Sequence, residues 1–163
     1  MEIWDAYNSR FEMIDGMTLI RGEESSIPKG IYHLVCNVIV RHIDGTYLLM
    51  QRDPRKSYPM MWEATAGGSA LKGETPTDCA VRELYEETGI NVSASELTEL
   101  NRRVCDETRC VYFDYLCTTD CDKDSIIIQE GETVAYKWSC PDDMSKMPDS
   151  ELLLKIKGMP VRA

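Results

Sequence analysis

The feature that most constrains the fold is a helix with a clear start and stop near the middle of the chain. Thr75 is a common N-cap residue, and Pro76 suits the first helical turn, where a proline loses no helical hydrogen bond. Gly89 stands where a C-cap glycine adopts the left-handed conformation. Together these residues predict a helix over about 75–87.

The predicted helix carries three carboxylates on one face. Residues three and four positions apart share a helix face, so Glu83, Glu86 and Glu87 point the same way. Like charges at this spacing, close to the C-terminal end of the helix dipole, disfavour the helix. A divalent cation such as Mg²⁺ would offset the repulsion, whereas a solvated acidic face is the alternative reading of charge spacing alone. The side that can face the core comprises Ala80, Val81, Leu84 and Thr88.

Strand signals occupy most of the remaining chain. The run at 31–42 is rich in β-branched residues, and Asp44-Gly45 is a hairpin signal before a return strand at 46–52. A final helix is expected over 149–157. Other strands are predicted at 2–7 and 17–21, around turns at Asn8-Ser9-Arg10 and Asp15-Gly16, and at 61–67, 97–107, 110–118 and 133–139. A β-rich centre with helices on its faces is an α+β architecture.

Composition limits the kind of protein. The chain has 163 residues, a common size for one domain, so a single domain is expected. Its 18 basic and 28 acidic residues give a net charge of −10, which argues against broad binding to nucleic acid. No apolar run reaches the roughly 18 residues of a membrane span. The acidic start and the odd count of seven cysteines favour a cytoplasmic enzyme with reduced thiols.

Residues 68–90 resemble the Nudix box, a motif of fixed spacing. The box reads G, five residues, E, seven residues, then R-E-apolar-x-E-E-x-G-apolar, and every fixed position matches. The matching residues are Gly68, Glu74, Arg82, Glu83, Leu84, Glu86, Glu87, Gly89 and Ile90. The resemblance implies the Nudix fold, an α/β/α sandwich with a loop–helix–loop motif on a mixed β-sheet. Residues 1–163 would form a single Nudix domain, with an N-terminal hairpin arm at 1–30 and the sandwich at 31–157.

The same resemblance assigns roles within the box. The metal ligands, for Mg²⁺ or Mn²⁺, would be the catalytic glutamates Glu83, Glu86 and Glu87 and the backbone carbonyl of Gly68. Arg82 would orient a catalytic glutamate, and Glu74 would be structural or hold a further metal through water. Gly68 and Gly89 would allow tight turns on either side of the helix. The implied reaction is metal-activated attack of water on phosphorus, which cleaves a diphosphate linkage in a small molecule such as a nucleoside diphosphate derivative.

Residues outside the box are candidates for the general base and for substrate binding. In the family, the base sometimes lies on a loop before a late strand, and Glu130 and Glu132 occupy that place here, with an ordinary polar loop as the alternative. A basic loop also precedes the box and could hold a terminal phosphate. The candidates for substrate binding are Arg52, Arg55, Lys56, Tyr58, Trp62 and Glu130, and Glu132 is the candidate catalytic base.

Further stretches look like the Nudix branch related to isopentenyl-diphosphate isomerase. They are WDAY (4–7), IRGEE (20–24), YHLVCNVIV (32–40) and the run at 48–74. That isomerase uses a catalytic cysteine just before the box, where this chain has Thr65-Ala66-Gly67-Gly68, so hydrolysis is favoured. A non-catalytic Nudix-fold sensor is a further alternative, although such modules usually lose the box carboxylates. The resemblance also suggests a homodimer formed through the N-terminal arm.

Overall fold

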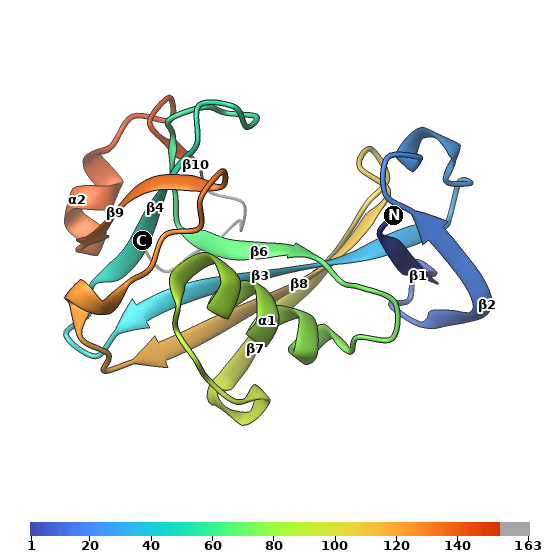
Figure 1. The fold of residues 1–163 in the computed structure, drawn as a ribbon, viewed down its shortest axis with the longest axis horizontal. Helices are drawn as coiled ribbons and strands as arrows, with labels where there is room; N and C mark the ends of the chain where they lie inside the picture. The colour runs from blue at the N-terminus through green and yellow to red at the C-terminus, as the bar shows by residue number, and fades with distance from the viewer. Residues whose placement is uncertain (154–163) are drawn as a thin grey trace.

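Strand β3 (Tyr32–His42) lies at the centre of the sheet in the computed structural model, which describes residues 1–153 (Figure 1). Along its length it pairs in parallel with β8 (Cys110–Thr119). Its antiparallel neighbours are β1 (Ile3–Tyr7), β4 (Tyr47–Arg52) and β6 (Thr65–Ser69). The predicted mixed sheet is therefore confirmed.

The remaining elements extend this sheet and cover it. They are β2 (Met13–Ile20), β5 (Trp62–Glu63), β7 (Leu97–Cys105), β9 (Thr133–Ser139) and β10 (Leu152–Leu153), with α1 (Pro76–Thr88), α2 (Pro141–Lys146) and short 3-10 helices at Glu24–Ser26, Ala94–Glu96 and Lys123–Ser125. The main strand order is β10-β5-β4-β3-β1-β2, with β6 and β8 on β3, β7 on β8 and β9 on β4. Among the described residues, no helix has the length and apolar character needed to cross a membrane.

Alternation along β3 and β4 divides the core between the two faces of the sheet. One cluster, beneath α1, includes Val38, Val40, Leu48, Met50, Ala80 and Leu84. The intervening residues Ile39 and Leu49 belong to a second cluster, which Met144 of α2 completes. Helices therefore cover both faces, and the predicted α+β sandwich is confirmed.

Helix α1 begins and ends where the local signals predict. The Thr75 hydroxyl accepts a hydrogen bond from the Asp78 N–H, and the Asp78 carboxylate accepts one from the Thr75 N–H, which forms a capping box. Gly89 closes the helix at φ 76°, a left-handed conformation that favours glycine. Because both ends are fixed, the rotation of the helix is fixed as well, with Ala80 and Leu84 facing the sheet.

The N-terminal hairpin belongs to the same sheet, because β1 pairs with both β2 and β3. The turn predicted near Asn8 is present. The turn predicted at 15–16 is wrong, since the pairing of Tyr7 with Met13 already starts β2 at Met13. Arg21, which directly follows β2, donates its N–H to the Glu2 carbonyl and lies at the edge of the cavity described below.

The final predicted helix, 149–157, is wrong in its described part. Residues 149–151 form a turn, and Leu152–Leu153 form β10, which pairs in parallel with β5. Residues 154–157 lie outside the described residues. A backbone pairing with the edge of β5, together with burial of Leu152, outweighs the local helix preference of this segment. Helix α2 lies within 141–148, a segment for which no element was predicted.

Candidate active site

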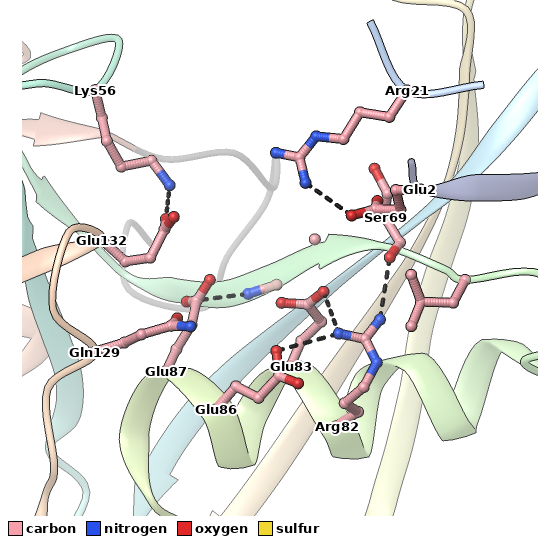
Figure 2. A pocket seen from close by; sticks show the side chains of 13 residues that line it. Glu2, Arg21, Lys56, Ser69, Arg82, Glu83, Glu86, Glu87, Gln129 and Glu132 are labelled. Carbon is pink, nitrogen blue, oxygen red and sulfur yellow. Dashed lines mark hydrogen bonds and ion pairs between the residues drawn. The ribbon is translucent and has the colours of Figure 1, made fainter.

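A cavity of about 260 Å³ opens where the polar side of α1 faces the end of β6 (Figure 2). Four parts of the chain meet there: the N-terminal hairpin, the loop after β4, the β6–α1 segment and the loop before β9. The lining residues are Glu2, Arg21, Lys56, Gly67, Gly68, Ser69, Leu71, Arg82, Glu83, Glu86, Glu87, Gln129 and Glu132. The three glutamates predicted to share a helix face therefore do share one cavity.

Arg82 organises the carboxylates of this cavity. Its guanidinium donates a bidentate pair to Glu74, at 2.6 Å from Nε and 2.9 Å from Nη2. Nη1 donates to Glu83 at 2.8 Å and to Glu86 at 3.3 Å, and Nη2 also donates to the Ser69 carbonyl at 3.1 Å. Burial would raise the pKa of Glu74, but the hydrogen bonds from Arg82 and a backbone N–H hold it below its ordinary value. The pairing supports the orienting role predicted for Arg82 and gives Glu74 a structural one.

Glu83 lies against the backbone of β6. Only 13% of its side chain is exposed, and a Cβ added at Gly68 would lie 2.6 Å from Glu83 Oε1. Burial raises the pKa of Glu83 although Arg82 donates to it, so the arginine alone does not compensate for the buried charge. The tight-turn role predicted for Gly68 is wrong, because Gly68 lies inside β6 opposite Cys36, where glycine makes room for the carboxylate.

The Glu87 side chain contacts β6 at Gly67, the residue before Gly68. Its Oε2 accepts a hydrogen bond from the Gly67 N–H at 3.3 Å. A Cβ added at Gly67 would lie 2.0 Å from the Cys36 carbonyl oxygen, so a larger residue cannot stand there without displacing β3. Sequence reasoning assigned no role to Gly67, although the adjacent glycine pair was a signal of close backbone approach.

The donor set fits a divalent cation. Within residues 1–153, no three acidic, histidine or cysteine side chains stand close enough, as placed, to enclose an ion. However, Glu83, Glu86 and Glu87 line one cavity, and carboxylate oxygens are the ligands that Mg²⁺ and Mn²⁺ prefer. The Gly68 carbonyl accepts a 3.6 Å hydrogen bond from the Cys79 thiol, and a carbonyl oxygen has a second lone pair for a cation. The buried carboxylate of Glu83, whose pKa is raised although Arg82 donates to it, also favours a bound cation.

Lys56 and Glu132 form an ion pair on one side of the cavity (Figure 2). Glu132 follows a tight turn in which its own N–H and that of Thr133 both donate to the Gln129 carbonyl at 3.1 Å. The Asp53 N–H donates to the Glu132 carbonyl at 2.9 Å, which joins this turn to the loop that carries Lys56. The structure thus brings a predicted catalytic residue and a predicted substrate-binding residue to the box glutamates.

Arg21 reaches the cavity from the N-terminal hairpin and was missed by the sequence analysis. Its Nη1 donates to Glu2 at 2.9 Å, and Glu2 also accepts from the Trp4 indole N–H at 2.7 Å. The Arg21 side chain is 66% exposed, and Figure 2 shows it across the cavity from Lys56. A single arginine at the end of a predicted strand carries no local signal of this placement.

Arg52, which was predicted to contact a substrate phosphate, has its guanidinium engaged in contacts within the protein. Its side chain is 8% exposed, and its Nη1 donates to Glu63 at 2.5 Å. Its Nε donates to the Ser57 carbonyl at 2.6 Å, and its Nη2 donates to the Ser57 hydroxyl at 3.1 Å. These contacts fix the loop at 53–60 and, with it, the position of Lys56.

We expect Arg52→Met to destabilise the fold by about 3–5 kcal/mol, because Glu63 would remain buried without the guanidinium. Urea unfolding followed by circular dichroism measures this change. Arg41→Met is the matched control, since Arg41 is an exposed side chain of β3, and little change is expected from it. Equal unfolding midpoints for the two variants would contradict the structural role of Arg52.

The other predicted substrate-binding residues do not line the main cavity. Arg55, Tyr58 and Glu130 are exposed side chains of the loops around it. Trp62 packs against the core cluster beneath α2. Of the predicted residues outside the box, Lys56 and Glu132 line the main cavity.

A second cavity, of about 270 Å³, adjoins the first and shares residues 67–69 with it. Its other lining residues are Val35, Asn37, Arg103 and Tyr112. The Arg103 guanidinium stacks 3.9 Å from the centre of the Tyr112 ring and donates to the buried Asp114 at 3.2 Å. Asp114 also accepts from the Asn37 amide at 2.9 Å. An aromatic ring and fixed polar groups therefore stand beside the carboxylate cavity, and sequence reasoning had missed them.

Comparison with known proteins gives a family and relatives of partial length. The NUDIX domain model matches residues 31–156. An uncharacterised Nudix hydrolase of Listeria monocytogenes is 42% identical over 96 residues, which are 58% of this chain and 55% of that protein. An isopentenyl-diphosphate Delta-isomerase of Dinoroseobacter shibae is 37% identical over 79 residues, 47% of this chain and 44% of that protein. The chain spans about half the length of the curated relatives it matches.

Solved structures show a shared fold. The Deinococcus radiodurans protein DR0079 has a TM-score of 0.70 at 22% identity, covering 88% of this chain and 86% of that chain. A MutT NUDIX hydrolase from Burkholderia pseudomallei has a TM-score of 0.56 at 23% identity, covering 68% of this chain and 84% of that chain. At these identities the likeness concerns the fold alone.

Proposed function

This chain belongs to the NUDIX domain family, and from that premise we propose that it is a Mg²⁺- or Mn²⁺-dependent hydrolase of a diphosphate linkage in a small molecule. The observation that carries the proposal is the clamp of Arg82 on Glu74 and Glu83 beside two further carboxylates in one cavity. Lys56 and Arg21 face these carboxylates from opposite sides. Such a mixed lining suits an anionic substrate that is bound together with cations.

Five side chains of the cavity have a part in the proposed reaction. Glu83, Glu86 and Glu87 would hold the metal, which supplies positive charge that stabilises the phosphate oxygens as charge develops on them. Arg82 keeps the Glu83 carboxylate in place. Glu132 is our candidate for accepting the proton of the attacking water, since it lines the same cavity as the box glutamates and lies beside Glu87 (Figure 2). The bond from phosphorus to the bridging oxygen then breaks, which leaves two phosphate-bearing fragments, or orthophosphate and a monophosphate.

The second cavity supports a polar organic group on the substrate. Arg103, Asp114 and Asn37 form a fixed polar network there, and Tyr112 offers an aromatic surface. Burying a prenyl chain against a guanidinium would cost free energy, whereas a planar polar ring can stack and hydrogen-bond. We therefore propose a nucleoside diphosphate derivative as the substrate class.

Isomerase activity is the second candidate function because of the isomerase relative. Its chemistry, as the resemblance implies it, needs a cysteine in the cavity. No cysteine is found among the described residues that line the main cavity, and the strand β6 that precedes the box contains none. A non-catalytic sensor is also less well supported, because all the box carboxylates are retained.

A panel of nucleotides, nucleotide sugars and prenyl diphosphates, each incubated with Mg²⁺ or Mn²⁺, tests this function. We expect phosphate-containing products from nucleoside diphosphate derivatives and little from prenyl diphosphates. Product separation by chromatography also detects an isomer formed without phosphate release. That result, or no turnover of any compound by the wild type, would contradict the proposal.

We expect Arg21→Ala to raise KM about 10- to 100-fold with little change in kcat, because a charge-assisted hydrogen bond to phosphate contributes about 1.5–3 kcal/mol. Steady-state kinetics on the best substrate of the panel measures the effect. Arg10→Ala is the control in the same hairpin, since Arg10 is 78% exposed and pairs with Glu12. An unchanged KM in Arg21→Ala would remove Arg21 from the substrate site.

The cellular setting and assembly are part of the proposal. All seven cysteines are free thiols in the structure, which supports a reducing cytoplasm. The exposed methionines Met13 and Met17 on β2 offer a surface for a homodimer formed through the N-terminal hairpin. Neither the cysteines nor these two methionines line the carboxylate cavity.

A further inference from the structure

Thr133, the first residue of β9, carries a buried hydroxyl that has no hydrogen-bond partner among the described residues. The residue is 8% exposed, and among residues 1–153 its Oγ1 is the one buried side-chain oxygen or nitrogen without a hydrogen-bond partner. Buried hydroxyls are almost always bonded to protein or to ordered water. The Thr133 N–H donates to the Gln129 carbonyl, which holds the backbone of this residue in place.

The hydroxyl lines a small cavity of about 20 Å³ that adjoins the main one, with which it shares Lys56, Gly67, Glu87 and Glu132. A single water molecule needs roughly 10–15 Å³ of such space and two to four polar partners. The lining residues are Arg52, Lys56, Glu63, Gly67, Glu87, Glu132 and Thr133. Two cations in this lining disfavour a metal ion, and three carboxylates disfavour an anion. A neutral water molecule is the ligand that fits both the volume and the charge.

A β-bulge sets the direction of Thr133. Gln51 of β4 pairs with Ala135, but the next residue, Arg52, pairs with Thr133, so Val134 is an extra residue in β9. Bulges of this kind re-aim side chains beside active sites. Val134 is 39% exposed while Thr133 is buried. The extra residue therefore turns the start of β9 toward the carboxylates.

We infer that this small cavity binds one water molecule between Thr133, Glu87 and Glu132, and that this water is the nucleophile. The second part rests on the hydrolysis proposed above. The water oxygen forms a bond to phosphorus, its proton passes to the Glu132 carboxylate, and the bridging P–O bond breaks with its electron pair on the departing phosphate. Thr133 is a positioning residue, since it contacts the water and not the substrate.

Two variants of Thr133 and a crystal structure test the inference. Thr133→Val keeps the shape but removes the hydroxyl, and we expect kcat to fall about 10- to 100-fold with KM within about twofold. Thr133→Ser restores the hydroxyl and should recover most of kcat. Thr118→Val, at an exposed threonine of β8, is the control and should match wild type. In high-resolution crystals grown without metal, wild type should hold an ordered water at Thr133 Oγ1, which Thr133→Val should lack.

Several outcomes would overturn the inference. Wild-type kcat in Thr133→Val would exclude the hydroxyl from the reaction. A Thr133 Oγ1 bonded to a protein atom in the wild-type crystal would remove the water site. Equal loss of kcat in both variants, with a lowered Tm, would show a purely structural residue. If wild type hydrolyses no diphosphate, the nucleophile assignment fails with the proposed function, while the crystals still decide the water site.

Discussion

Glu87→Gln is expected to lower kcat by about 100- to 1000-fold while the protein stays folded. The carboxamide keeps the shape of the side chain, and its oxygen can still accept the hydrogen bond from the Gly67 N–H. What is lost is the negative charge that a divalent cation requires, and loss of one electrostatic stabilising group typically has an effect of this size. The measurement is kcat at saturating Mg²⁺ on the best substrate of the panel, with Tm from circular dichroism.

Two controls accompany this variant. Glu130→Gln changes an exposed glutamate close to Glu132 and should leave kcat within about twofold of wild type. Removal of divalent cations with EDTA should abolish wild-type activity, and excess Mg²⁺ should restore it. If Glu87→Gln loses its fold, the acidic cluster is structural. If it turns over like wild type, the carboxylate takes no part in the reaction.

Alanine at the two adjacent glycines of β6 is expected to affect different properties: mainly the stability of the fold at Gly67, and mainly kcat at Gly68. Gly67→Ala should destabilise the fold by more than about 3 kcal/mol, because its Cβ would lie 2.0 Å from the Cys36 carbonyl oxygen and only backbone movement can relieve that contact. Gly68→Ala should fold with a smaller loss, because its Cβ would meet the Glu83 carboxylate, the end of a side chain. Its kcat should nevertheless fall about 100-fold or more, since Glu83 is pushed from its place beside Arg82.

Denaturant unfolding and kinetics on both variants separate the two effects, and each variant serves as the control for the other. A stable and active Gly67→Ala would contradict the close approach of β6 to β3. A Gly68→Ala protein with normal kcat would show that the position of the Glu83 carboxylate is not required. Both outcomes can be read from the same two protein preparations.

The parts of the fold that sequence reasoning predicted are those set by local chemistry. The ends of α1 follow from Thr75 and Gly89, whose effects act within a few residues. The paired strands likewise follow from alternation and from Asp44-Gly45. The fixed spacing of the box placed Glu83, Glu86 and Glu87 on one face, and the structure puts all three in one cavity.

What sequence reasoning could not predict depends on partners far away in the chain. Arg52 and Lys56 belong to the same basic stretch of sequence, and nothing local distinguishes them. In the structure, Arg52 is buried in an ion pair with Glu63, whereas Lys56 pairs with Glu132 in the cavity. Arg21 reaches the cavity because β1 pairs with both β2 and β3, an arrangement that no residue close to Arg21 in the chain signals. Leu152 and Leu153 formed a strand because the edge of β5 was available, which no local propensity records.

The three residues shared by the two cavities, 67–69, separate parts of the protein that can change independently. The proposed metal-binding carboxylates Glu83, Glu86 and Glu87 belong to one helix, whereas the polar network of the second cavity comes from β3, β7 and β8. If the second cavity binds part of the substrate as proposed, we expect substitutions at Arg103 or Tyr112 to alter which molecule is accepted without changing the box. Proteins that descend from one ancestral chain can therefore diverge in substrate specificity while the box stays the same, so an unchanged box is a poor guide to the substrate of any one of them.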